Sequence, residues 1–413
     1  MKIESTTGLP GSPGSGPGEF SSHARPRLES IDLLRGLVMV IMALDHVRDF
    51  FTGAKFDPTD LAQTNAAYFL TRWITHFCAP VFVFLAGTGA YLSSTRGKTK
   101  PQLSWFLVTR GLWLIFLEMT VVHFGWSYNW SLQYCGGAVI WALGWSMCVL
   151  AALIHFPLSV VTGFGVAMIA FHNLMDGMSH QTMMLPSWLW KILHAGGRIQ
   201  VLPGYEFSAS YPLIPWIGVM AAGYGFGAIV LRESNSRRKW LLRLGFSLTA
   251  IFFLLRSGNF YGDPQPWSPQ NQTLLSVFSF LNCTKYPPSL LYLLMTLGPA
   301  LVVLALLDRG IGPVARPLVI FGRVPLFYYL LHLPLIHGAA ILFAYARHGR
   351  AEWLFENPWI VDRLGILDKP GDYGYGLPMV YAVWLGIVLL LYPVCRWFAS
   401  VKQRSRAAWL SYF

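Results

Sequence analysis

Long apolar segments alternate with shorter polar stretches along most of this chain. A helix needs about 20 apolar residues to cross a bilayer, and ten segments reach or approach that length. They lie at residues 32–51, 69–93, 104–124, 136–154, 157–173, 212–231, 240–256, 288–307, 318–345 and 379–398. The fifth is short and suits a tilted or re-entrant helix. The pattern predicts an all-α, polytopic membrane helix bundle with about ten transmembrane helices.

Basic residues fall in alternate loops between these segments. If the chain crosses ten times, every strongly basic stretch lies on one side of the membrane, and an excess of Lys and Arg marks cytoplasmic loops. We therefore expect both termini in the cytoplasm. The residues behind this prediction are Arg25, Arg27, Arg96, Lys98, Lys100, Arg232, Arg237, Arg238, Lys239, Arg309, Arg316, Lys402, Arg404 and Arg406.

The two ends of the chain differ from its apolar middle. Residues 1–24 are rich in Gly, Ser and Pro, a composition typical of disorder. They contain no apolar core, so they do not form a signal peptide, and the first span is expected to act as an uncleaved anchor. The predicted organisation is a disordered cytoplasmic tail at 1–26, one transmembrane domain at 27–400 and a basic cytoplasmic tail at 401–413.

The composition agrees with a membrane protein and argues against other classes. Hydrophobic residues make up 54% of the 413 residues and charged residues only 12%, against about 25% charged in soluble domains. The net charge of +12 comes from basic residues between apolar segments, so nucleic acid is not an expected partner. The five cysteines form no CxxC or Cys/His spacing, so neither a disulfide framework nor a metal site is predicted.

The first span carries charges that an ordinary membrane helix lacks. An ionisable group inside a bilayer costs ~3 kcal/mol or more, so it needs a partner and suggests function. Asp32 and Arg35 are three residues apart and predict a structural ion pair at the cytoplasmic end. Asp45 and His46 follow roughly 15 Å further along the axis. They form a candidate acid–imidazole pair near the outer end, which we favour over a purely structural polar cluster.

Further polar groups lie at a similar depth in the second and third spans. His76 is either a catalytic base or a hydrogen-bonded interface histidine, and the sequence leaves both open. His123 lies near the outer end of its span and could join the same cluster. Glu118 lies about one turn deeper and needs a partner, for which Arg72 or His76 is expected.

Two later regions carry candidate binding groups. Lys285 and Tyr286 end a long external loop, where Lys285 either binds an anion or extends its ammonium to the interface. His332 lies in the ninth span, behind a helix break at Gly322–Pro325 that holds Arg323. Such a break exposes backbone donors able to meet a phosphate or a carbonyl group, although it also suits an ordinary helix start with an anchoring arginine.

Four stretches together resemble one family: RLESIDLLRGL at 27–37, APVFVFLAG at 79–87, YPLIPWIGVM at 211–220 and GRVPLFYYLLH at 322–332. They resemble the heparan-alpha-glucosaminide N-acetyltransferase-like bacterial membrane proteins, within the transmembrane acyltransferase superfamily. The resemblance covers residues 30–400, and the ordered set is far more specific than its first member. In the lysosomal member an asparagine stands at the position of Asp45 and a histidine follows shortly after it. Here His46 follows directly, and His76 is the nearest later histidine.

The resemblance implies transfer of an acyl group, typically acetyl, from cytosolic acyl-CoA to a sugar hydroxyl or amine on the other side of a bacterial inner membrane. The expected partners are membrane lipid, acyl-CoA as co-substrate and a carbohydrate acceptor, with no metal, and a homodimer is left open. His46 or His76 would remove the acceptor proton, with Asp45 charging or orienting the imidazole. The expected acyl-CoA-binding residues are Arg35, Arg96, Arg110, Arg323 and His332, and the expected acceptor-binding residues are His123, Lys285 and Tyr286.

Two other functions remain open at this point. A sugar or lipid transporter or sensor could use the same polar cluster as a binding site. A membrane redox protein would need axial ligands, for which His76, His123 and His332 are candidates. The chain contains no Walker A loop, GxSxG elbow or HExxH motif, so the corresponding nucleotide, hydrolase and zinc-protease chemistries are not indicated.

Overall fold

The computed structural model describes residues 28–310, 312–356, 369–405 and 407–413. The tail predicted at 1–26 and the basic residues Arg25, Arg27 and Arg406 lie outside this part of the chain. Helices dominate what is described, and the predicted fold class, a helical polytopic bundle, is confirmed.

All ten predicted membrane segments correspond to helices. In chain order they are α1 (Glu29–Phe51), α2 and α3 (Ala66–Thr75 and Cys78–Ser94), α4, η1 and α5 (Lys100–Leu117, Glu118–Val122 and His123–Ser127), α6 (Val139–Leu153), α7 with η2 (Leu158–Phe171 and His172–Met175), α9 (Leu213–Val230), α10 (Ser234–Gly258), α12 (Leu290–Leu307), α13 and α14 (Arg316–Arg323 and Pro325–His348), and α16 (Leu377–Arg404). Eight of these segments are long and apolar enough to cross a membrane. Of the other two, α6 has 15 residues and α1 carries several charges.

The sequence did not predict the small sheet. Its strands are β1 (Tyr134–Gly137), β2 (Gly197–Leu202) and β3 (Tyr205–Ala209), in the order β1-β3-β2, with β1 parallel to β3 and β2 antiparallel to it. These strands come from two loops between spans, so they pair only after the bundle brings the loops together. The remaining short helices are α8 (Ser187–Trp190), η3 (Lys191–Ala195), α11 (Thr273–Leu281), η4 (Pro313–Ala315), η5 (Glu352–Leu354) and η6 (Ala408–Tyr412).

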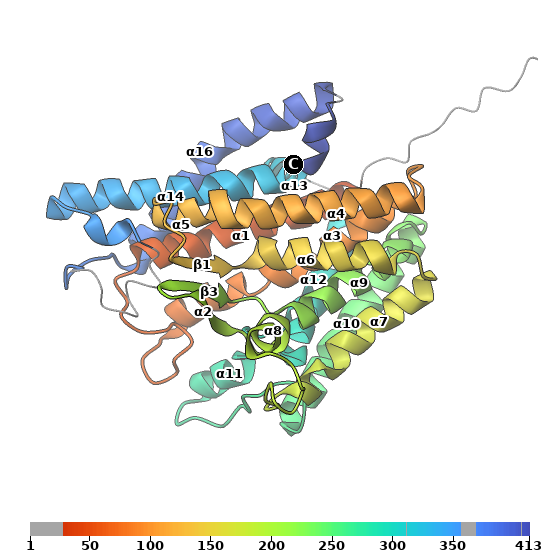
Figure 1. Ribbon diagram of the computed structural model, residues 1–413, viewed down its shortest axis with the longest axis horizontal. Helices are drawn as coiled ribbons and strands as arrows, with labels where there is room; N and C mark the ends of the chain where they lie inside the picture. Colours follow the sequence, from red (N-terminus) through yellow and green to blue (C-terminus); the bar gives the residue numbers. More distant parts are fainter. Residues whose placement is uncertain (1–27, 311, 357–368, 406) are drawn as a thin grey trace, which may run out of the picture.

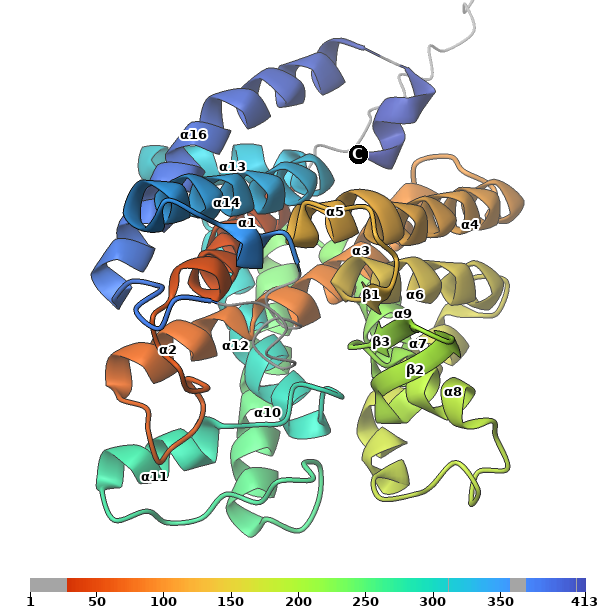
Figure 2. The ribbon, with the colours of Figure 1, turned by 60° about the vertical axis from the view of Figure 1, so that its left-hand side comes forward.

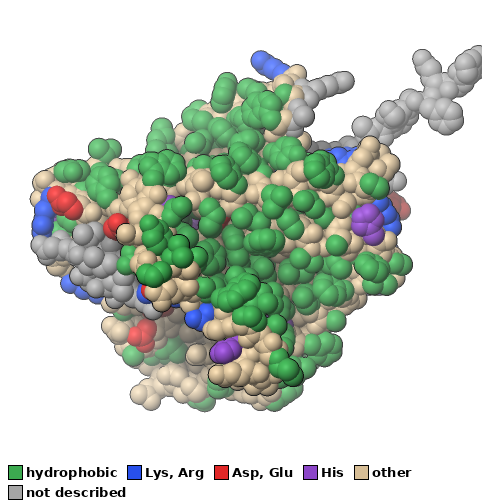
Figure 3. All heavy atoms as spheres, in the orientation of Figure 1, with side chains coloured by type: hydrophobic (Ala, Val, Ile, Leu, Met, Phe, Trp, Pro, Cys, Tyr) green, Lys and Arg blue, Asp and Glu red, His purple; other side chains and the backbone are tan. Residues whose placement is uncertain are grey.

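The surface agrees with a protein embedded in a bilayer. Helices α4, α6 and α14 follow the long axis of the molecule (Figure 1), and hydrophobic side chains cover the middle of that face (Figure 3). The charged side chains visible there lie mainly towards its ends. After α16 the chain folds back into η6, where Leu410 is buried (Figure 2). Residues 401–404 thus extend the last helix, and the segment assigned to a tail packs partly against the bundle.

Small residues set the position of α1 against α13. A Cβ atom on Gly36 would lie 1.8 Å from the carbonyl oxygen of Leu318, and one on Gly322 would lie 1.7 Å from that of Asp32. Neither distance is possible without moving the backbone, and such close helix contacts are a usual role of glycine in membrane bundles. The contact fixes the height and rotation of α1, which carries most of the unusual charges.

We expect Gly322→Ala to lower the thermal unfolding midpoint of the protein in detergent. The added methyl group must separate α1 from α13, and overpacking of this kind costs about 1–3 kcal/mol. Gly386→Ala in α16 is the matched control, because a Cβ atom there meets no described atom within 4 Å. Equal unfolding midpoints for the two variants would contradict the close contact between α1 and α13.

Candidate active site

Two cavities lie along α1. We call the first the histidine cavity; it has a volume of about 450 Å³, and its polar lining includes Asp45, His46, Asp49, Arg72, Glu118, His123, Arg198, Glu206, Lys285 and Tyr286. We call the second the arginine cavity; it has a volume of about 410 Å³, and its polar lining includes Asp32, Arg35, Arg96, Lys98, Arg110, Arg323 and Lys402. Both are large enough for a ligand of moderate size.

The arginine cavity gathers the four arginines expected to bind acyl-CoA, Arg35, Arg96, Arg110 and Arg323. Arg35 lies 3.7 Å from Asp32, the partner expected from its spacing, and donates to the carbonyl oxygen of Leu85 at 3.0 Å. Arg323, the last residue of α13, contacts Glu29 at 3.1 Å. The predicted helix break follows directly, with Val324 in a non-helical conformation before Pro325.

The chain after α16 closes part of this cavity. Arg110 donates to the carbonyl oxygen of Ser411 at 2.6 Å, and Phe413 belongs to the cavity lining. Lys98 lies 3.6 Å from the centre of the Phe106 ring. Partial burial and the nearby charge of Arg110 lower the pKa of Lys98. The mouth of the cavity thus combines aromatic rings with cationic side chains.

Asp45 has two arginine partners in the histidine cavity. Its two carboxylate oxygens lie 2.7 and 2.6 Å from Nη1 of Arg72, and Arg48 lies 3.0 Å away. Asp45 is thus held by arginines, and its predicted role in charging or orienting His46 stays a prediction. Consecutive helix residues point about 100° apart, so Asp45 and His46 face different neighbours.

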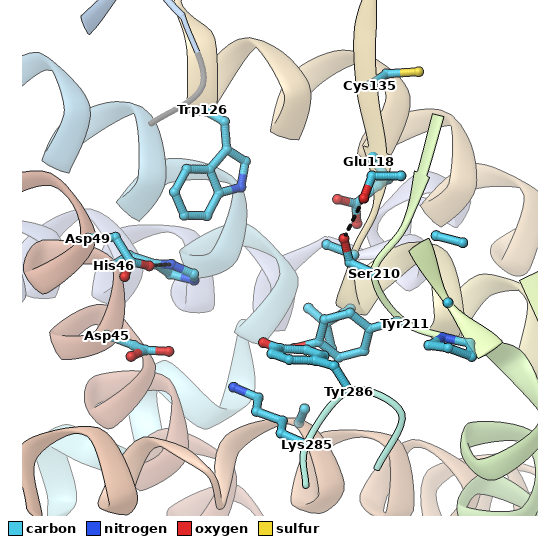
Figure 4. Close-up of a pocket in the computed structure, with 18 of the residues that line it drawn as sticks. Asp45, His46, Asp49, Glu118, Trp126, Cys135, Ser210, Tyr211, Lys285 and Tyr286 are labelled. Carbon is cyan, nitrogen blue, oxygen red and sulfur yellow. Dashed lines mark hydrogen bonds and ion pairs between the residues drawn. The ribbon is translucent and has the colours of Figure 1, made fainter. Parts of the chain in front are cut away.

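Asp49 is the carboxylate that faces His46. Its Oδ2 lies 3.6 Å from Nδ1 of His46, and the i,i+3 spacing puts both on one face of α1 (Figure 4). The His46 ring also packs edge-on against Trp126, with 5.0 Å between ring centroids. Nδ1 of His46 is buried and has no hydrogen bond within the described residues. The geometry allows Asp49 to stabilise a protonated imidazole.

His76 and His332 are buried beside the two cavities rather than in their lining. His76 is buried beside Tyr292, with 5.6 Å between ring centroids, and is not among the residues that line either cavity. His332 lies next to His46 at 5.2 Å and likewise lines neither cavity. The roles predicted for His76 as a base and for His332 as an acyl-CoA-binding residue stay predictions.

The other predicted acceptor-binding residues all line the histidine cavity. His123 makes a 2.7 Å hydrogen bond with the carbonyl group of Ser131. Lys285 lies 5.1 Å from the centre of the Tyr286 ring, which meets Tyr211 edge-on at 5.4 Å (Figure 4). Burial, with the neighbouring Tyr286, holds the pKa of Tyr211 well above its usual value, so Tyr211 is a neutral hydrogen-bonding group.

Glu118 has a different partner from those expected. Its Oε2 accepts a 3.1 Å hydrogen bond from the backbone N–H of Trp141 at the start of α6. The first N–H groups of a helix lack partners within it, so a buried carboxylate there is stabilised by backbone donors. The prediction that Glu118 pairs with Arg72 or His76 is wrong, because Arg72 pairs with Asp45.

Several lining residues were missed from the sequence. Asp49 could have been found from its i,i+3 spacing with His46. Trp126 enters the lining through the packing of α5, and the 3.2 Å ion pair between Arg198 and Glu206 depends on the hairpin of β2 and β3. Burial raises the pKa of the Cys135 thiol in the same cavity, which disfavours a reactive thiolate. Within the described ranges, no group of three or more His, Cys, Asp or Glu residues could hold a metal ion.

The two cavities are neighbours inside the bundle. Both are lined by Met42, Phe82, Val139 and Tyr329. On α1, Arg35 lies in the arginine cavity, Met42 at the junction and His46 one turn beyond it. Arg35 and His46 are therefore roughly 16 Å apart along the helix axis. A ligand that extends from the arginine cavity would meet a ligand in the histidine cavity beside these shared residues.

A known family matches more than half of the chain. The model of the family "heparan-alpha-glucosaminide N-acetyltransferase, catalytic" matches residues 27–258. The matched region contains the charged face of α1, the ion pair of Asp45 with Arg72, and the sheet. No curated protein matches the sequence. The protein belongs to the heparan-alpha-glucosaminide N-acetyltransferase catalytic family.

Proposed function

We propose that the protein is a membrane acyltransferase that moves an acetyl or related acyl group from acyl-CoA to a sugar hydroxyl or amine. The observation that carries this proposal is the pair of cavities, one basic and one holding a histidine beside a carboxylate, which share lining residues inside the bundle. A transporter needs one site that opens alternately to two sides, whereas group transfer needs two substrates side by side.

The arginine cavity suits the donor. Coenzyme A carries phosphate groups, and arginine binds phosphate through paired N–H donors. Arg35, Arg96, Arg110 and Arg323 lie around one space, together with two lysines. The positive-inside bias of the loops supports a cytoplasmic location for this end, where acyl-CoA is available, and for both termini. A bacterial inner membrane is part of the same proposal.

The histidine cavity suits a carbohydrate. Trp126, Tyr211 and Tyr286 offer flat apolar faces together with polar groups that can hydrogen-bond hydroxyls. Lys285 and His123 add polar groups to the lining of the same cavity. Few sites in a membrane bundle combine so many polar side chains, because each is costly unless it is paired or hydrated.

His46 is the base in this mechanism. Its imidazole takes the proton from the acceptor hydroxyl or amine as the oxygen or nitrogen attacks the thioester carbonyl carbon. Asp49 stabilises the resulting imidazolium, as a carboxylate does beside a catalytic histidine. When the carbon–sulfur bond breaks, the departing thiolate takes the proton back from His46, and the acyl group stays on the acceptor.

The test uses the full-length protein purified in detergent. We expect acetyl-CoA to raise its unfolding temperature, and we expect acetyl-CoA with glucosamine to release free CoA thiol and acetylated sugar, detected by mass spectrometry. Uptake of labelled glucosamine into proteoliposomes without acetylation would favour the transporter. Absence of both stabilisation and thiol release would contradict the proposed function.

Arg96 gives a specific prediction for the donor cavity. It is exposed at the cavity mouth, so Arg96→Gln should fold normally and raise the KM for acetyl-CoA roughly tenfold, since a charge-assisted hydrogen bond contributes ~1.5 kcal/mol. The kcat should stay within about twofold of the wild-type value, because the phosphate contact is the same in the ground and transition states. Arg243→Gln, at an exposed position that lines neither cavity, is the control. A similar KM for the two variants would remove Arg96 from the donor site.

A further inference from the structure

Tyr329 occupies a particular place between the two cavities. It lies on α14, only 7% of its surface is exposed, and it lines both cavities. The other shared residues, Met42, Phe82 and Val139, have no hydrogen-bond donor in their side chains. The phenol of Tyr329 is therefore the one side-chain donor among the described residues at the junction.

Its hydroxyl is not used by the fold. Within the described part of the chain, the Tyr329 hydroxyl makes no hydrogen bond to another protein group, and it is not among the fully enclosed polar atoms. By contrast, the hydroxyls of Tyr128, Tyr261 and Tyr292 each donate to a backbone carbonyl group. The hydroxyl of Tyr328 also lacks a partner, but it is fully enclosed in the bundle. Tyr329 instead lines both cavities, so a ligand there can accept from its hydroxyl, and an unsatisfied buried donor is otherwise costly.

Tyr329 is also connected to the proposed base. Nδ1 of His332 lies 2.6 Å from the carbonyl oxygen of Tyr329, and the His332 ring lies 5.2 Å from the His46 ring. The rings of Tyr329 and His332 are 5.4 Å apart. These contacts join α14 to α1 beside the junction and hold the phenol and the imidazole on neighbouring helices.

We propose that Tyr329 is a catalytic residue that donates a hydrogen bond to the carbonyl oxygen of the thioester, an assignment that rests on the proposed function. As the acceptor attacks the carbonyl carbon, the π pair of the C=O bond moves onto that oxygen. The Tyr329 O–H stabilises the oxyanion without losing its proton. When the intermediate collapses, the pair returns to re-form the C=O bond, the C–S bond breaks, and the thiolate accepts the proton from His46.

The test compares Tyr329→Phe with Tyr328→Phe in the full-length protein. Tyr328 directly precedes Tyr329 on α14. Its hydroxyl is fully buried, and it lines neither cavity. We expect Tyr329→Phe to lower kcat for acetyl-CoA-dependent thiol release by roughly 10²–10³-fold, the usual loss for one oxyanion donor. The KM for acetyl-CoA should change less than about twofold, because the bond strengthens only in the transition state. Tyr328→Phe should keep the wild-type kcat.

A second pair of variants separates the donor from the shape of the side chain. Tyr329→Gln and Tyr329→Met are similar in size, but only the glutamine retains a donor. The glutamine variant is expected to be more active than the methionine variant at equal thermal stability. Equal activity of these two, or a wild-type kcat in Tyr329→Phe, would overturn the assignment and leave the proposed function intact. A wild-type protein that binds acetyl-CoA but releases no thiol would contradict the proposed function itself, and the assignment with it.

Discussion

His46→Ala is expected to reduce acetyl-CoA-dependent turnover by roughly 10²–10⁴-fold, the range for loss of a general base. Its imidazole lines the histidine cavity beside Asp49 at 3.6 Å, one helical turn from the junction of the two cavities. The thermal shift produced by acetyl-CoA should remain, because the donor groups lie in the arginine cavity. The decisive measurement is kcat at saturating acetyl-CoA, together with that shift.

Three further variants make this prediction specific. Asp49→Asn should also lower kcat, by less than His46→Ala, because the amide keeps the shape but cannot stabilise the imidazolium by its charge. His155→Ala, at an exposed site, controls for loss of a histidine in general. His76→Ala distinguishes the two bases that the sequence left open. Normal turnover in His46→Ala with a large loss in His76→Ala would reverse the assignment, and normal turnover in both would exclude a general-base role for either.

Arg72→Gln is expected to destabilise the protein by ~3 kcal/mol, because removing one partner leaves the other charge buried and only partly compensated. The side chains of Arg72 and Asp45 are only 10% and 12% exposed, and their closest approach is 2.6 Å. Arg48 still contacts Asp45 at 3.0 Å, which keeps the expected loss at the lower end of the range for buried pairs. The measurement is the free energy of unfolding in detergent.

A double-mutant cycle tests the pair directly. Asp45→Asn combined with Arg72→Gln should recover part of the stability lost in Arg72→Gln, because no buried carboxylate is then left behind. Glu206→Gln is the exposed control, since Arg198 and Glu206 are 28% and 37% exposed at 3.2 Å, and surface pairs contribute about 1 kcal/mol or less. Strictly additive effects for Asp45 and Arg72 would show that their contact does not stabilise the fold.

Removing the Asp45–Arg72 pair and removing His46 should therefore have separable effects. The ion pair holds α1 against α2, so its loss should mainly lower the free energy of unfolding. His46 contacts the acceptor in the proposed reaction, so its loss should mainly lower kcat. A variant of Asp45 that unfolded no more easily than the wild type but had lost turnover would move Asp45 back into the catalytic group that the sequence suggested.

The sequence by itself determined the membrane bundle, its ten helical segments, the family, and the charged face of α1. These features depend on local composition and on the helical period: apolar runs of sufficient length must lie in lipid, and residues three or four apart must share a face. The pair of Asp32 with Arg35 follows from that period alone, and so does the alignment of His46 with Asp49. The grouping of Arg35, Arg96, Arg110 and Arg323 followed from their common place at one end of the spans.

Only the tertiary structure decided which side chains meet across helices. Arg72 is distant from Asp45 in the sequence, yet the two form an ion pair. Glu118 accepts a hydrogen bond from the backbone at the start of α6 rather than pairing with a cation. The rotation and height of each helix decide these contacts. The sheet needs strands from two loops, which pair only when the bundle closes. The same holds for the junction at Tyr329: whether a tyrosine in an apolar helix faces lipid, core or cavity depends on how α14 packs against α1, α5 and α16.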